Sequence, residues 1–128
     1  MLYYLEIKNL SNLKSESLQD FYDVKEGLYE NDGSFYIGRP SILGNPFSEK
    51  RYGRVKCIEM YREYLWNAIK FNNERIKSTL IKMMKMYDRN NKLILWCYCS
   101  PKKCHGDIIR LCLEWMNVNY NSSSKYFS

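Results

Sequence analysis

One short apolar run constrains the fold of this chain more than any other feature. Residues 93–96 read Leu-Ile-Leu-Trp, inside a longer segment that extends from Lys92 to Cys99. A strand that is apolar on both faces is typical of a parallel sheet covered by helices on both sides. The run therefore predicts a central, buried strand.

Strand and helix patterns alternate around this run. Two further segments predict short strands, residues 2–7 and 34–37, whereas residues 17–31 are ambiguous between a short helix and an irregular edge. Apolar residues recur at three- and four-residue steps in three segments: 54–71, 74–87 and about 104–117. Strands separated by helical crossovers predict an α/β fold, a small single domain with a parallel or mixed three- to four-stranded sheet packed by helices.

The extent of the domain follows from length and polarity. The chain has 128 residues, of which 45% are hydrophobic, as expected for one domain with one core. We expect the domain to span residues 1–118 and a polar, frayed tail to follow at 119–128. In the last helix, Ile108, Cys112 and Trp115 are expected on one side.

No segment predicts a membrane span or a secretion signal. No apolar run approaches the ~20 residues that a membrane helix needs, and Met1–Glu6 lacks a basic segment. We therefore expect a cytoplasmic protein, with no membrane partner, whose five cysteines are reduced. The net charge of +6 favours an anionic partner, either a small nucleotide-like ligand or nucleic acid. Because the basic residues are spread along the chain, solvated helix faces are the alternative explanation.

The first candidate segment for function is residues 38–47, here called the glycine loop. Two glycines and two prolines in ten residues predict a shaped loop with four candidate ligand-binding residues, Gly38, Arg39, Ser41 and Asn45. Gly38 and Gly44 would permit a positive φ or the close approach of a ligand. Arg39 suits a phosphate or carboxylate, and Asn45 could read a base or sugar edge. In the alternative interpretation, Arg39 pairs with an acid and Asn45 caps the chain.

The second candidate segment is residues 97–107, here called the cysteine loop. It reads Cys97-x-Cys99-x4-Cys104-His105-Gly106-Asp107 and adds Lys103 as a ligand-binding candidate. The N-terminus of a helix near residue 104 would attract an anion and lower the pKa of the Cys104 thiol. His105 is the single histidine of the chain and hence the candidate general acid or base. Asp107 would orient His105 or cap the helix.

Two other interpretations of the cysteine loop stay open. Four residues could ligate structural zinc: Cys97, Cys99, Cys104 and His105. The spacing lacks the usual two-residue knuckles, so no metal or other cofactor is expected in the main hypothesis. In the remaining interpretation these cysteines are small buried thiols and His105 is a helix-cap donor. Four aromatic residues near the two loops could stack on a base or belong to the core: Tyr36, Phe47, Trp96 and Tyr98.

Both loops begin where a predicted strand ends. In parallel α/β sheets, ligands bind beyond the carboxyl ends of the strands. If the two strands are parallel neighbours, the glycine loop and the cysteine loop meet at one edge of the sheet and form a single site.

The two loops also carry a family resemblance. Gly38-Arg39-Pro40-Ser41-x-x-Gly44-Asn45-Pro46-Phe47, then Tyr61-Arg62-x-Tyr64-Leu65, then Cys97-x-Cys99-x-Pro101-x-x-Cys104-His105-Gly106-Asp107 is similar to the family called domain of unknown function 4326. The resemblance covers about residues 34–116 and leaves most of the first thirty residues outside. It implies one small domain of bacterial or phage origin, but no reaction. A phage origin would place the protein in a bacterial host cell.

Three functions remain as hypotheses. The first is an enzyme that processes a nucleotide or nucleoside derivative, most simply a hydrolase of an N-glycosidic or phosphoester bond, with His105, Cys104 and Asp107 as catalytic residues. The second is a non-catalytic viral protein that sequesters a nucleotide-type immune signal. The third is a structural zinc or nucleic-acid-binding module.

Overall fold

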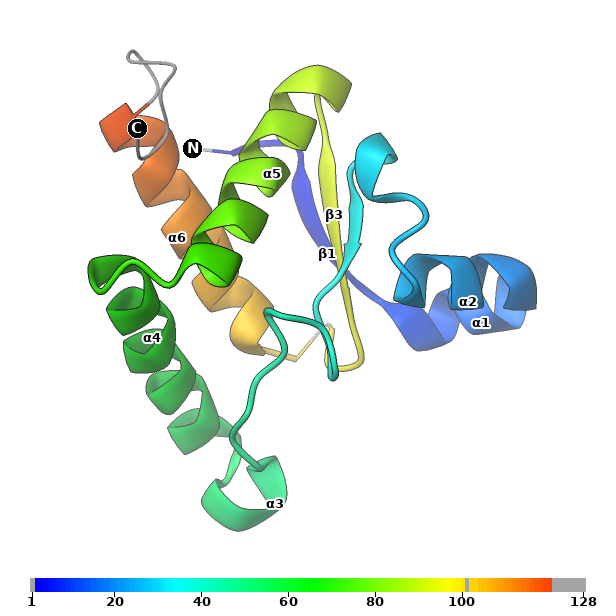
Figure 1. The fold of residues 1–128 in the computed structure, drawn as a ribbon. Helices are drawn as coiled ribbons and strands as arrows, with labels where there is room; N and C mark the ends of the chain where they lie inside the picture. Colours follow the sequence, from blue (N-terminus) through cyan, green and yellow to red (C-terminus); the bar gives the residue numbers. More distant parts are fainter. Residues whose placement is uncertain (1, 101, 121–128) are drawn as a thin grey trace.

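The computed structural model describes residues 2–100 and 102–120 as one layered α/β arrangement (Figure 1). Its elements in chain order are β1 (Leu5–Asn9), α1 (Leu10–Glu16), α2 (Leu18–Lys25), the 3-10 turn η1 (Glu30–Asp32), β2 (Ser34–Tyr36), α3 (Glu49–Tyr52), α4 (Arg54–Lys70), α5 (Glu74–Asn90), β3 (Leu93–Cys97) and α6 (His105–Tyr120). No helix within this described part is long and apolar enough to cross a membrane.

The sheet has three parallel strands in the order β1-β3-β2. The apolar run at residues 93–96 therefore lies in the central strand, as predicted from its composition. Leu95 of β3 is in register with Ile7 of β1 on one side and with Phe35 of β2 on the other. The expected α/β fold with a small parallel sheet is confirmed.

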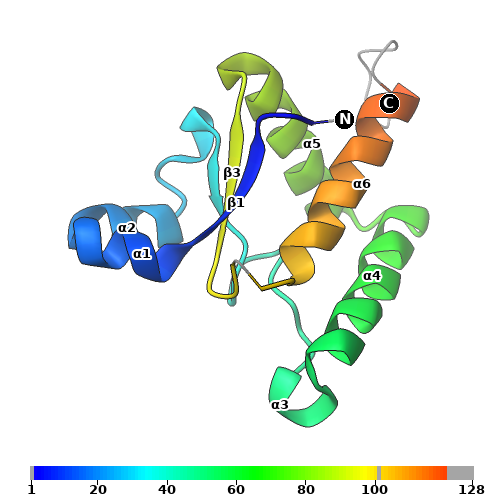
Figure 2. The same ribbon diagram turned by 180° about the vertical axis from the view of Figure 1, so that it is seen from behind.

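Helices cover the two faces of the sheet unequally. Helices α4, α5 and α6 lie on one face, and α1 and α2 lie on the other, near the carboxyl ends of the strands (Figures 1 and 2). The larger core forms against the first face and includes the fully buried Tyr61, Leu65 and Leu95. The smaller core, on the second face, is built around Leu10 and Phe21.

The N-terminal segment differs most from the sequence expectation. β1 begins at Leu5 rather than at residue 2, and the polar stretch that follows it forms α1. The cause is helix capping, because the Asn9 side chain accepts a hydrogen bond from the Ser11 amide and the Ser17 hydroxyl accepts one from Asp20. The ambiguous residues 17–31 accordingly contain α2 and η1.

Two helices extend beyond their expected ends. α5 continues to Asn90 because Asn91, with φ 56°, provides the left-handed cap. α6 continues to Tyr120, so the first two residues of the tail expected at 119–128 are helical, and residues 121–128 lie outside the described residues. Trp115, at helical spacing from Ile108 and Cys112 on α6, is 38% exposed and packs edge-to-face on Trp66 of α4.

Candidate functional site

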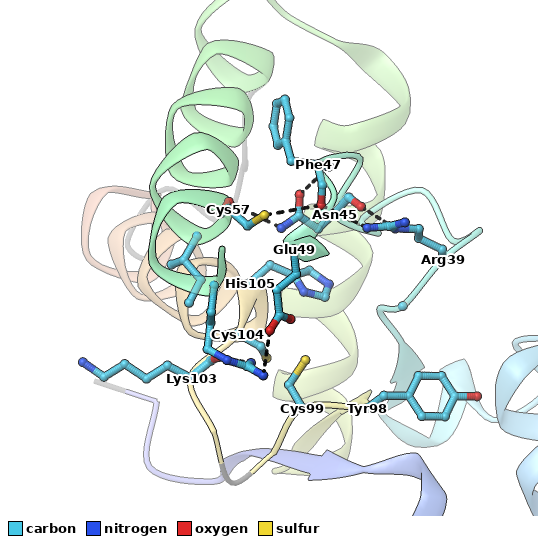
Figure 3. Close-up of a pocket in the computed structure, with 13 residues that line it drawn as sticks. Arg39, Asn45, Phe47, Glu49, Cys57, Tyr98, Cys99, Lys103, Cys104 and His105 are labelled. Atoms are coloured by element: carbon cyan, nitrogen blue, oxygen red, sulfur yellow. Dashed lines mark hydrogen bonds and ion pairs between the residues drawn. The ribbon is translucent and has the colours of Figure 1, made fainter. Parts of the chain in front are cut away.

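The glycine loop and the cysteine loop follow β2 and β3, which are adjacent parallel strands. They meet at the carboxyl edge of the sheet and, with α3 and α4, enclose a pocket of about 150 Å³, here called the edge pocket (Figure 3). Nine loop residues line it: Gly38, Arg39, Asn45, Phe47, Tyr98, Cys99, Lys103, Cys104 and His105.

His105 lies on the wall of the edge pocket at the first turn of α6 and is only 8% exposed. Its Nε2 lies 2.6 Å from the carbonyl oxygen of Ile37, and its ring packs edge-on against Tyr61. A carbonyl can only accept, so Nε2 carries the proton and Nδ1 keeps its lone pair. Burial lowers the pKa of His105, which is therefore neutral at pH 7. Within the described residues Nδ1 has no hydrogen-bond partner.

Asp107 serves the helix rather than the imidazole. Its Oδ2 accepts a hydrogen bond of 3.1 Å from the Cys104 amide at the start of α6. Such a bond satisfies one of the amides that a helix N-terminus leaves unpaired. Asp107 does not line the edge pocket. Of its two expected roles, the geometry favours the cap over the orienting partner of His105.

The Cys104 thiol is not activated in the expected way. A hydrogen bond with the Cys97 thiol, together with burial, raises the pKa of Cys104, although the Gly106 amide acts in the opposite direction. The neighbouring sulfur and burial therefore raise the pKa of Cys104 more than the helix N-terminus lowers it. Cys104 faces the edge pocket as a protonated thiol, which is a weak nucleophile.

The glycine loop is held together by its own polar side chains. The Arg39 Nε donates to the Asn45 carbonyl at 2.7 Å, and one terminal nitrogen donates to the Phe47 carbonyl at 3.0 Å. Asn45 accepts from the Phe47 amide at 2.9 Å and donates to the Cys57 carbonyl (dashed lines in Figure 3). Both ends of the Asn45 amide thus hydrogen-bond to the backbone. Arg39 keeps donors for a ligand and pairs with no acid among the residues that the structure describes.

One protein family matches most of the chain. A family model described as "Domain of unknown function (DUF4326)" matches residues 23–115. The chain belongs to this family. The DUF4326 match begins earlier than the expected residue 34 and includes every residue that lines the edge pocket.

A curated relative of this DUF4326 protein comes from Enterobacteria phage T4. Its name is "Uncharacterized 12.4 kDa protein in nrdA-td intergenic region", and it is 32% identical over 81 residues. The aligned part covers 63% of this chain and 68% of the relative. No solved structure matches the chain.

Three residues of the DUF4326 glycine loop have roles that the structure narrows. Gly38 and Gly44 do not have a positive φ. A Cβ at Gly38 would lie 2.5 Å from the Tyr36 hydroxyl, and one at Gly44 would lie 3.0 Å from the Gly38 carbonyl. These glycines are therefore required by packing inside the loop. Ser41 does not line the edge pocket, because its hydroxyl is buried on the other side of the loop with no partner in the described structure.

Sequence reasoning missed the contribution of α3 and α4 to the DUF4326 pocket. Arg54, the first residue of α4, forms an ion pair of 3.2 Å with Glu49 and donates to the Lys103 carbonyl at 3.0 Å. Both Arg54 and Glu49 line the edge pocket. The N-terminal end of a helix dipole favours acidic residues, yet the first turn of α4 begins with Arg54 and contains no acid. This unusual charge was the sequence signal that could have pointed to Arg54.

The alternative zinc site is not assembled. Among residues 2–100 and 102–120, no three His, Cys, Asp or Glu side chains converge as a metal ion would require. His105 directs Nε2 at a carbonyl rather than at the cysteines. Of the four proposed ligands, Cys99, Cys104 and His105 line the edge pocket, whereas Cys97 does not.

Proposed function

We propose that this protein is a hydrolase that acts on a nucleotide or nucleoside derivative in the edge pocket, at an N-glycosidic or phosphoester bond. The observation that carries the proposal is the presence, in one pocket, of a neutral buried imidazole with an unpartnered nitrogen and three cations. The cations are Arg39, Arg54 and Lys103. They supply anion recognition, and the imidazole supplies a proton acceptor.

Arg54 and Arg39 suit a phosphate for different reasons. Arg39 is fixed by the two loop carbonyls, so the ordering of its side chain is already complete before a ligand arrives. Arg54 is held by Glu49 and by a carbonyl, and a phosphate can replace the carboxylate of Glu49 as its anionic partner. Lys103, which is exposed, adds a third positive charge to the edge pocket.

His105 is the proposed general base. The hydrogen bond from Nε2 to Ile37 fixes the tautomer and the orientation of the ring, which leaves Nδ1 to take a proton from water. The hydroxide equivalent adds to the substrate, and the departing group leaves with the electron pair of the broken bond and is protonated in turn. A neutral imidazole at pH 7 is in the state that this step requires.

Two of the four candidate aromatic residues remain available for a base. Phe47 and Tyr98 line the edge pocket, while Tyr36 and Trp96 pack in the smaller core. Phe47 is held edge-on by Tyr64, and Tyr98 is exposed. Stacking on such rings is sequence-tolerant and favours a nucleobase or another flat group.

A non-catalytic binder is the second candidate, and one observation favours it. Asp107 is committed to the helix cap and Cys104 is protonated, so His105 has neither of the catalytic partners expected from the sequence. The same pocket would then hold a nucleotide-type signal intact. Because a phage protein is related to this chain, the form of this alternative to test is the sequestration of a host immune signal.

Arg54→Gln tests the anionic character of the ligand. Loss of a charge-assisted hydrogen bond of about 1.5–3 kcal/mol predicts roughly 10- to 100-fold weaker binding of nucleoside phosphates in calorimetric titration. Arg62→Gln removes the same charge from an exposed position on α4 and should leave the affinity within about twofold. Equal effects of the two substitutions would mean that only net charge matters and that Arg54 does not contact the ligand.

A further inference from the structure

The net positive charge of this protein is gathered around the edge pocket. Every residue that lines the pocket lies in one of two stretches, 38–58 or 98–105. These stretches hold seven basic residues and one acidic residue, which accounts for the whole net charge of +6, whereas the rest of the chain has thirteen of each sign. The seven basic residues are Arg39, Lys50, Arg51, Arg54, Lys56, Lys102 and Lys103. Basic residues are therefore spread along the sequence, but uncompensated positive charge is not.

Three of these cations lie on either side of the pocket without lining it: Lys50, Arg51 and Lys102, here called the outer cations. Lys50 and Arg51 belong to α3 and follow directly on Glu49 of the pocket wall, and Lys102 directly precedes Lys103. All three are exposed, and none forms an ion pair within the part of the chain that the structure describes. Because α3 projects beyond the carboxyl edge of the sheet (Figures 1 and 2), the outer cations flank the pocket from two segments.

The size of the edge pocket limits how much of a ligand it can enclose. Its volume is about 150 Å³, whereas sites that enclose a drug-sized molecule measure about 300–1,000 Å³. A ligand that reaches His105 with its base or sugar therefore keeps other parts outside the pocket. The outer cations attract negative charge to that outside region, which a ligand with several phosphates supplies.

Two exposed tyrosines accompany the cations. Tyr98 lines the pocket and is 44% exposed, and its ring is held edge-on by Tyr36 at a centroid distance of 6.1 Å. Tyr52 is 39% exposed at the end of α3, where the Arg51 guanidinium lies 5.3 Å from its ring centroid. Exposed aromatic rings and guanidinium planes beside a basic surface are the elements on which unpaired bases stack.

We propose that the edge pocket and the outer cations bind single-stranded nucleic acid, with one nucleotide in the pocket and the neighbouring phosphates on the outer cations. This inference rests on the proposed function and names the form of its substrate. A free nucleotide fills the pocket in the same way but gains nothing from the outer cations. A base inside a duplex is excluded, because His105 is only 8% exposed and a paired base cannot reach it.

Fluorescence anisotropy with labelled nucleic acids tests the proposal. The probes are single-stranded DNA and RNA of about 12 nucleotides with randomised sequence, and a DNA duplex of the same length, with nucleoside monophosphates as competitors. We expect at least one of the single strands to bind roughly 10- to 100-fold more tightly than the monophosphates, because three further phosphates are neutralised. It should also bind more tightly than the duplex, and comparison of DNA with RNA identifies the sugar.

Substitution of the outer cations identifies the surface. The variant Lys50→Gln/Arg51→Gln/Lys102→Gln loses three phosphate contacts, each of which contributes about 0.7 to the slope of log affinity against log salt concentration for a single strand. The slope should therefore become shallower by about 2. All three side chains are exposed, so the fold should be kept.

The matched control removes the same charge from the opposite edge of the sheet. Lys85 and Arg89 lie near the end of α5, Lys92 directly precedes β3, and all three are exposed. Lys85→Gln/Arg89→Gln/Lys92→Gln should keep the slope and the affinity of the wild-type protein for the strand.

The outcomes separate this inference from the proposed function. Equal binding of single strands and monophosphates would overturn the inference and leave the edge pocket as a site for free nucleotides. Equal slopes in the two triple variants, or a duplex bound as tightly as a single strand, would also overturn it, because net charge alone would then explain the binding. Absence of binding by every probe, the monophosphates included, would overturn the proposed function as well.

Discussion

His105→Gln is expected to abolish turnover while keeping the fold, and His105→Ala is expected to damage both. A glutamine amide can still donate to the Ile37 carbonyl, but it has no basic nitrogen in place of Nδ1. Loss of a general base predicts a fall in rate of roughly 10²- to 10⁴-fold. Alanine leaves the Ile37 carbonyl unpaired in the core, at a cost of about 1–3 kcal/mol, and also leaves a cavity beside Tyr61.

The two His105 variants therefore separate chemistry from stability. Turnover of a nucleotide substrate measures the first, and the urea midpoint of unfolding measures the second. His105→Ala alone cannot separate the two, because it also removes the buried hydrogen bond to Ile37. Undiminished turnover by a folded His105→Gln variant would remove His105 from the role of base.

Tyr61→Phe is expected to loosen the glycine loop from α4. The Tyr61 hydroxyl is fully buried and donates to the Leu43 carbonyl at 2.7 Å, so its removal leaves that carbonyl unsatisfied. The expected cost is about 1–3 kcal/mol in the free energy of unfolding. Ligand affinity should fall as well, since Arg39 depends on the shape of the same loop.

Tyr64→Phe provides the matched control. Tyr64 lies one turn further along the same helix and contacts the rings of Phe47 and Tyr61, but its hydroxyl makes no hydrogen bond to the loop in the described structure. Its loss should change stability by less than about 0.5 kcal/mol. Urea denaturation at unchanged m-value decides between the two outcomes. An equally mild effect of Tyr61→Phe would show that the loop keeps its shape without this anchor.

The sequence predicted the framework of the site well because that framework follows from periodicity. The apolar run at residues 93–96 identified the central strand, and the regular recurrence of apolar residues identified α4 and α5. Since β2 and β3 are parallel neighbours, the loops that follow them had to meet at one edge. Only topology was needed for that inference.

The roles of individual polar residues could not be predicted in the same way. Asparagine, aspartate and serine side chains can hydrogen-bond either to the backbone or to a ligand, and the sequence does not show which. Tertiary contacts decide between the two for Asn45, Asp107 and Ser41. The side chains of Asn45 and Asp107 hydrogen-bond to the backbone, and Ser41 faces away from the edge pocket. Arg54 was overlooked because its partners, Glu49 and the Lys103 carbonyl, come from two other segments.

The N-terminal segment shows a related limit. No helix was predicted at residues 9–16, and residues 17–31 stayed ambiguous, yet Asn9 and Ser17 each cap the start of a helix. Capping residues and turn residues are the same amino acids. What distinguishes them here is the burial of Leu10 and Phe21 against the sheet, which depends on contacts distant in the sequence.

The most direct test of the edge pocket as a nucleotide site is mass spectrometry of a nucleotide-rich cell extract after incubation with the wild-type protein and with His105→Gln. We predict that one anionic, nucleotide-like component is consumed by the wild-type protein and left unchanged by the variant. An intact nucleotide-like molecule released on denaturation of both proteins, at near one per chain, would contradict hydrolysis and favour the binder. An extract in which no such component is either consumed or retained would contradict the account of the pocket itself.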